Sequence, residues 1–121
     1  MTSFLEGAMD QDFRLKDYLA CISRMTLLSD EEQGQAFEAW KLGDERARRL
    51  LEERHLIAVV AWASAYRGAG LSLLGLIETG NRGMLKALRR AGPARADEFL
   101  DYLRLAVEEE IESTLVARRG A

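Results

Sequence analysis

Residues 56–63 read Leu-Ile-Ala-Val-Val-Ala-Trp-Ala and are apolar on every side of a helix. A helix of this kind is usually surrounded by other helices. We therefore expect it to be the central helix of the fold. It forms the second half of a helix that Asp44 caps and that covers about residues 45–66. The apolar run is too short for a membrane span, which needs about 20 residues.

Four more helices are predicted around this one, because apolar residues recur three and four apart and cap residues precede them. They cover about residues 10–24, 29–43, 72–91 and 97–117. Ser29 and Glu32 match a capping box, and Ser72 stands at a further cap position. Gly80 and Gly83 lie within the helix over residues 72–91, where each costs about 1 kcal/mol of helix propensity. We expect this pair to allow close contact with another helix.

These signals predict an all-α fold, a compact bundle of about five helices with no sheet. The length of 121 residues fits one domain, residues 1–121, with its core over about residues 10–118. The expected core contains aromatic and aliphatic side chains from several helices: Trp40, Trp62, Phe99, Leu103 and Val107.

Charge is distributed unevenly along the chain, although the net charge is only −3. Residues 66–96 contain six basic residues and one acidic residue, and both flanking segments are net acidic. This basic segment either meets an acidic partner surface or forms solvated helix faces. Cys21 is the single cysteine, so no internal disulfide is possible, and the N-terminus shows no signal-peptide pattern. We therefore expect a cytoplasmic location with no membrane contact.

Few residues are available for catalytic or metal chemistry. His55 is the single histidine, so no second histidine can help it to hold a metal ion. Cys21 lies on a mainly apolar helix, which favours a buried thiol over a nucleophile. The glutamates at positions 108–110 and 112 point around their helix and indicate a solvated face. We predict no catalytic residues, no metal, no cofactor and no enzymatic activity.

A series of short segments in a fixed order carries a family resemblance. The segments are Leu27-Leu28-Ser29-Asp30-Glu31-Glu32, Gly43-Asp44-Glu45-Arg46-Ala47, His55-Leu56-Ile57-Ala58-Val59-Val60, Tyr66-Arg67-Gly68-Ala69-Gly70-Leu71-Ser72-Leu73-Leu74 and Leu76-Ile77-Glu78-Thr79-Gly80-Asn81-Arg82-Gly83-Met84-Leu85-Lys86-Ala87. In this order they resemble the housekeeping-type sigma factors of bacterial RNA polymerase. The similarity covers about residues 13–103, from the helices before region two through most of region two, and the Leu-Ile-x-x-Gly-Asn-x-Gly stretch gives it specificity.

The resemblance implies a docking surface for RNA polymerase. In the family, the long apolar helix and the Gly-Asn helix form a hairpin whose outer face binds the clamp helices of the largest polymerase subunit. Matched by position, the partner-binding residues are Leu56, Glu78, Thr79, Asn81 and Leu85. Arg82 joins them, since positions 78, 81, 82 and 85 share one side of a helix. Asn81 has an alternative role, which is to satisfy backbone groups near the paired glycines.

Two departures from the family pattern make this surface less acidic. Gly75 stands where the family usually has an aspartate, and Glu78-Thr79 replaces a Gln-Glu pair.

The last predicted helix departs further from the family. Phe99 and Tyr102 match aromatic positions that help sigma factors to capture unpaired promoter bases, where stacking contributes about 1–3 kcal/mol per base. The family's tryptophan pair is replaced by Leu105 and Ala106. Acidic residues stand where aromatic, basic or amide residues are usual: Asp97, Glu98, Glu108 and Glu109. Phosphate affinity depends on positive charge, so we predict at most a weak nucleic-acid site and a degenerate promoter-DNA face.

Several functions are compatible with these observations. The family reading is a sigma-factor-like transcription initiation protein that docks on the clamp helices. The alternative is a helical protein-interaction or regulatory module that keeps the sigma fold without binding promoters. A third possibility is a fragment of a longer sigma factor, and an enzyme is the outside possibility. The acidic last helix favours the module over the family reading, because truncation alone would not replace tryptophans by leucine and alanine.

Overall fold

The computed structural model describes residues 8–120 of the chain, with side chains from residue 14 onward. The elements in this part are α1 (Ala8–Ser23), α2 (Asp30–Lys41), α3 (Glu45–Arg54), α4 (Leu56–Ser64), α5 (Leu73–Leu88), a short 3-10 turn (Ala96–Glu98) and α6 (Phe99–Gly120). Residues 8–120 contain no strand, so the predicted all-α bundle is confirmed. Residues 1–7 and 121 of the expected domain lie outside the described residues.

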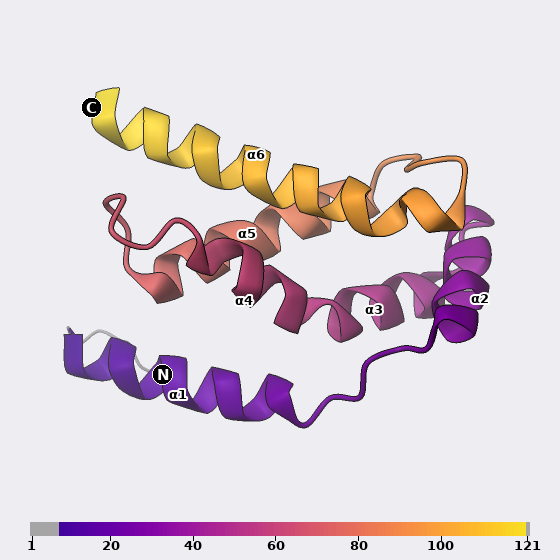
Figure 1. Cartoon of the computed structure of the whole chain (residues 1–121), viewed down its shortest axis with the longest axis horizontal. Helices are drawn as coiled ribbons and strands as arrows, with labels where there is room; N and C mark the ends of the chain where they lie inside the picture. Colours follow the sequence, from indigo (N-terminus) through magenta and orange to yellow (C-terminus); the bar gives the residue numbers. More distant parts are fainter. Residues whose placement is uncertain (1–7, 121) are drawn as a thin grey trace.

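The helices are arranged around α5, which packs against α6 on one side and α4 on another. Figure 1 shows α6 along one side of the molecule and α1 along the opposite side, with α3 and α4 between them. The short helix α2 closes one end of the bundle, next to the 3-10 turn that leads into α6. None of the described helices is both long and apolar enough to cross a membrane.

Three of the predicted helix starts are confirmed by their caps, whereas the last helix begins at Phe99, after the 3-10 turn, and not at about residue 97. The Ser29 hydroxyl accepts a hydrogen bond from the Glu32 amide at 3.1 Å, and the Glu32 carboxylate accepts one from the Ser29 amide at 2.9 Å. The Asp44 carboxylate accepts from the amides that open α3, and the Ser72 hydroxyl accepts from the Gly75 amide that opens α5. Each cap satisfies backbone donors that a helix N-terminus otherwise leaves without partners.

The prediction of one long helix over residues 45–66 is wrong. The segment forms two helices, α3 and α4, which are separated at His55. The His55 ring Nδ1 lies 2.7 Å from the Leu51 carbonyl oxygen, which a continuing α-helix would bond to the His55 backbone amide. That amide bonds the Glu52 carbonyl instead, at 3.3 Å. A side chain that enters the backbone ladder in this way kinks the helix. The fold therefore has six α-helices in the described part of the chain.

The predicted close contact at the paired glycines is confirmed. A Cβ atom placed on Gly80 would lie 2.8 Å from a Val59 methyl of α4, and one on Gly83 would lie 2.8 Å from the Ala106 carbonyl oxygen of α6. The two glycines therefore let α5 approach both neighbouring helices more closely than any side chain would allow.

The core joins α2, α5 and α6 through aromatic rings. The Phe99 ring is fully buried and lies 5.8 Å and 5.6 Å, between ring centroids, from Phe37 and Trp40. The Trp40 indole N–H donates to the Leu88 carbonyl at 2.9 Å, which ties the end of α2 to the end of α5. Leu103 and Val107 are buried in the same core, as predicted.

The predicted core is wrong at Trp62, which was expected to be buried. It is only half-buried at the edge of the core, because α4 lies toward the outside of the bundle and leaves Ile57 40% exposed. In α4 only Val59 and Ala63 are fully buried, so this apolar helix is not surrounded within residues 8–120.

Candidate partner-binding face

The outer side of α5 faces away from the core. Glu78 and Arg82, one helical turn apart, are exposed, and Leu85 is half-exposed beside them. This side is roughly opposite the one that carries Gly80 and Gly83, because an α-helix has 3.6 residues per turn and positions 80 and 83 fall about half a turn away from positions 78 and 85. Three of the predicted partner-binding residues therefore lie on one accessible helix surface.

Two other predicted residues lie elsewhere. Thr79 is 4% exposed and faces into the bundle, so it cannot contact a partner without rearrangement. Leu56 begins α4 and is half-buried against the core. The predicted set is thus divided between the outer side of α5, the core and a second helix.

Acidic α6 partly neutralises the basic residues of α5. The Glu110 carboxylate accepts hydrogen bonds from the Lys86 ammonium at 2.9 Å and from the Arg82 guanidinium at 3.4 Å. The hydrogen bond and charge of Lys86, followed by those of Arg82, lower the pKa of Glu110 below its usual value. These contacts reduce the positive charge that the sequence of residues 66–96 offers to an acidic partner.

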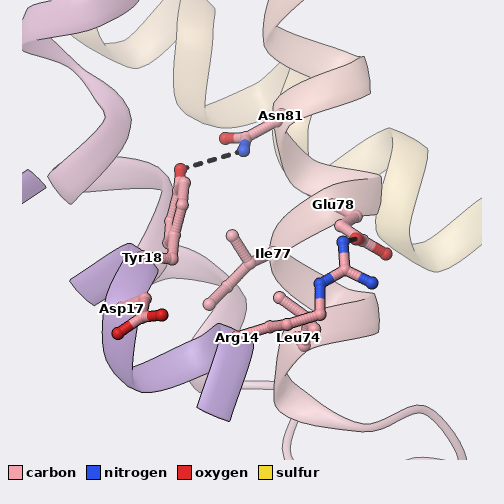
Figure 2. Close-up of a pocket in the computed structure, with 7 residues that line it drawn as sticks. All are labelled: Arg14, Asp17, Tyr18, Leu74, Ile77, Glu78 and Asn81. Atoms are coloured by element: carbon pink, nitrogen blue, oxygen red, sulfur yellow. Dashed lines mark hydrogen bonds and ion pairs between the residues drawn. The ribbon is translucent and has the colours of Figure 1, made fainter. Parts of the chain in front are cut away.

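Helix α1 lies across the flank of the outer α5 side. The Asn81 amide NH2 donates to the Tyr18 phenol oxygen at 3.1 Å, and the Arg14 guanidinium lies 3.9 Å from the Glu78 carboxylate. Figure 2 shows the Tyr18 ring pointing from α1 toward Asn81. Burial raises the pKa of the Tyr18 phenol. Predicted partner-binding residues are therefore already in contact with the chain's own first helix.

A cleft remains between α1 and α5. Its volume is about 360 Å³, and its walls come from both helices: Arg14, Asp17, Tyr18, Leu74, Ile77, Glu78 and Asn81. The α1 residues of this cleft were not predicted as site residues. The signal that could have found them is the one-turn spacing of Arg14 and Tyr18, which places both on one side of α1.

The aromatic rings proposed for base stacking, Phe99 and Tyr102, have limited access to solvent. Phe99 is 0% exposed, because its ring fills the space between α2 and α6. Tyr102 is half-buried, and its hydroxyl donates to the Ala87 carbonyl at 2.6 Å. Neither ring stands free to accept an unpaired base in this conformation.

The neighbouring surface of α6 carries one basic residue, Arg104, whose guanidinium lies 3.5 Å from the Glu108 carboxylate. Leu105 is 60% exposed and Glu109 is also exposed, whereas Ala106 is buried. The positions that carry basic or amide residues in the family thus offer no positive charge to a phosphate.

Two residues considered for metal or thiol chemistry have other surroundings. His55 is 6% exposed, and burial lowers the pKa of its ring, whose Nε2 lies 3.1 Å from the Gln33 side-chain amide. In the described residues, no cluster of three or more histidine, cysteine, aspartate or glutamate side chains could hold a metal ion. Cys21 was predicted to be buried but is exposed, because it lies on the outer side of the peripheral helix α1.

Comparison with known proteins identifies related chains. This chain is 37% identical over 95 residues to the RNA polymerase sigma factor SigA of Clostridium acetobutylicum, which covers 78% of this chain and 25% of that protein. It is 36% identical over 85 residues to SigA of a Bacillus species, covering 70% of this chain and 22% of that protein. No family model matches the chain.

These similarities confirm the resemblance that was predicted from the sequence. The chain is similar to bacterial RNA polymerase sigma factors, and specifically to one segment of a housekeeping-type sigma factor. It spans about a quarter of the length of the curated relatives that it matches.

Proposed function

We propose that the chain acts in transcription initiation as a cytoplasmic, sigma-factor-like helical domain that docks on the clamp helices of RNA polymerase. The docking surface is the outer side of α5, formed by Glu78, Arg82 and Leu85 with Asn81 at its flank. The chain carries no catalytic role in this proposal.

The geometry of α5 supports this proposal most strongly. Gly80 and Gly83 hold one side of the helix against α4 and α6, and this packing fixes the orientation of the opposite side. That opposite side combines a half-exposed leucine with an acidic and a basic residue. An apolar anchor among polar groups is the composition with which helix surfaces recognise partner helices reversibly.

We further propose that the promoter-DNA face is degenerate. Phe99 is buried, the Tyr102 hydroxyl is bonded to α5, and Glu108 and Glu109 are acidic. Strand capture in sigma-like proteins requires accessible rings and positive charge near the phosphates. The chain should therefore show no preference for promoter single strands at physiological salt.

The test is the affinity of the full chain for purified bacterial core RNA polymerase. Leu85→Ala and Arg82→Gln should weaken binding severalfold while the chain remains folded. Leu105→Ala is the matched control for the leucine, because Leu105 is exposed on α6, away from the proposed surface. Equal binding by Leu85→Ala, Arg82→Gln and the parent chain would place the interface elsewhere.

A regulatory interaction module is the second candidate function, and the acidic α6 surface favours it. Such a module would bind the polymerase or a regulator without supporting initiation. An initiation assay with core polymerase and promoter DNA separates the two functions. Polymerase binding without promoter-dependent transcripts would support the module, and promoter-dependent transcripts would exclude it.

A further inference from the structure

We infer that α1 is a displaceable cover on the proposed docking surface and occupies the position of a polymerase helix until the chain binds. The inference rests on the proposed function and concerns its regulation. Helix α1 contacts residues of α5 that also belong to the surface proposed to bind the polymerase.

The overlap involves Glu78 and Asn81. Arg14 and Tyr18 are one turn apart on α1 and approach these two residues of α5. Helix α1 therefore presents a basic side chain and a phenol along a helix face. A partner helix with one basic residue and one hydrogen-bonding residue would present the same chemistry to α5.

The contact between α1 and α5 is incomplete. The Asn81 side-chain oxygen is buried, and no group in the described residues donates a hydrogen bond to it. A buried polar atom without a partner is unfavourable, so this contact is weaker than a fully bonded one. The cleft of about 360 Å³ beside it shows that α1 does not fill the surface that it covers. A partner helix that supplies a donor to Asn81 and fills the cleft would bind in preference to α1.

The attachment of α1 permits such an exchange. Among its described side chains only Ile22 is fully buried, and the Arg14 and Glu78 side chains are 46% and 57% exposed. Solvent weakens an ion pair of this exposure. Residues 24–29 connect α1 to α2, and the Arg54 guanidinium donates to the Thr26 carbonyl at 2.9 Å. A released α1 would therefore stay tethered to the bundle and could close again.

A covered surface lowers the apparent affinity for a partner by the fraction of molecules in which it is uncovered. The experiment compares Tyr18→Phe and Arg14→Ala with the parent chain, using purified core RNA polymerase as the binding partner. Both variants weaken the α1 contact and leave the outer side of α5 unchanged. Tyr18→Phe should bind the polymerase about two- to tenfold more tightly, the range expected from one neutral hydrogen bond. Arg14→Ala should also bind more tightly but by a smaller factor, because the exposed ion pair that it removes contributes less. Lys16→Ala is the control, since Lys16 is exposed on α1 outside the cleft.

Hydrogen exchange of the full parent chain provides a second readout. Amides of α1 should lose protection when core polymerase is added, while those of α6 keep it. Weaker polymerase binding by Tyr18→Phe, or greater protection of α1 in the complex, would show that α1 is part of the interface. Unchanged affinity in both variants, with Leu85→Ala still weakening binding, would overturn the inference alone. If no variant and no parent chain binds the polymerase, the proposed function fails and the inference fails with it.

Discussion

The two sides of α5 differ in how completely they are covered. On the inner side, Gly80 and Gly83 bring the helix so close to α4 and α6 that an added Cβ would lie within 2.8 Å of its neighbours. On the outer side, α1 covers only a flank and leaves a cleft and one buried oxygen without a donor. One helix therefore contains both a tightly packed contact and an incompletely formed one.

The inner side of α5 stabilises the fold, whereas the outer side is the proposed recognition surface. The inner contact is complementary in shape and has no room to change, because packed interiors resist added volume. The outer contact is made by partly exposed polar side chains together with partly buried apolar ones such as Leu15. We propose that this contact exchanges one helix for another. Substitutions in the tightly packed inner core should therefore have larger effects on stability than substitutions on the outer surface.

The largest effect is expected from Phe99→Ala. If Phe99 serves the core and not a nucleic acid, its loss should lower the free energy of unfolding by about 3–5 kcal/mol. Denaturant unfolding measures this change, and Leu100→Ala, at a residue 47% exposed, is the control. A nearly unchanged unfolding curve for Phe99→Ala would contradict the buried position of the ring.

The next largest effect is expected from Gly83→Ala. The added Cβ meets the Ala106 carbonyl and Glu110, so it should push α5 from α6 and cost about 1–3 kcal/mol. Gly34→Ala is the matched control, because a Cβ on Gly34 meets nothing within 4 Å. That change should stabilise α2 by about 0.5–1 kcal/mol. Equal melting temperatures for the two variants would show that the close contact between α5 and α6 at Gly83 does not determine the stability of the fold.

A pH effect is expected at His55, on the packed side. Burial lowers its pKa below the usual 6.5, so the unfolded chain takes up a proton before the folded chain does. The free energy of unfolding is therefore unaffected by protonation of His55 above about pH 6.5, and it decreases as the pH falls from 6.5 toward the lowered pKa. The slope is at most about 1.4 kcal/mol per pH unit for one proton. Unfolding measured from pH 7 to 5 should show this slope in the parent chain, and His55→Gln should remove it.

The smallest effect is expected at the outer contact. Tyr18→Phe should cost about 0.5–1.5 kcal/mol in the local attachment of α1 and leave the packing of α5 on α6 intact. Amides of α1 should exchange about two- to tenfold faster, with those of α6 unchanged. Faster exchange throughout the chain would show that α1 supports the whole bundle and is not a separate cover.

Local signals explain why most of the fold was predictable from sequence. Ser29, Asp44 and Ser72 start helices through bonds to amides within three residues, so the sequence alone identifies them. The paired glycines were also interpreted correctly as a close helix contact. The break at His55 was missed, because no glycine or proline marks it and the ring bonds a carbonyl one turn back.

The candidate site was less predictable, because it depends on contacts between distant segments. The sequence placed Thr79 and Asn81 together, but the bundle buries one and turns the other toward α1. Phe99 fits both an apolar stripe and an aromatic recognition position, and only the assembled core shows that its ring is enclosed. The contact between Tyr18 and Asn81 joins residues 63 positions apart, which no local pattern indicates.

Site-specific photocrosslinking to core RNA polymerase tests the central claim most directly. A photoreactive side chain is placed at position 82, 85 or 105 of the full chain, and the crosslinked polymerase peptides are identified by mass spectrometry. Positions 82 and 85 on α5 should crosslink to the clamp helices of the largest subunit, and position 105 on α6 should not. Crosslinks to the clamp helices from position 105, with none from positions 82 and 85, would contradict docking through the outer side of α5.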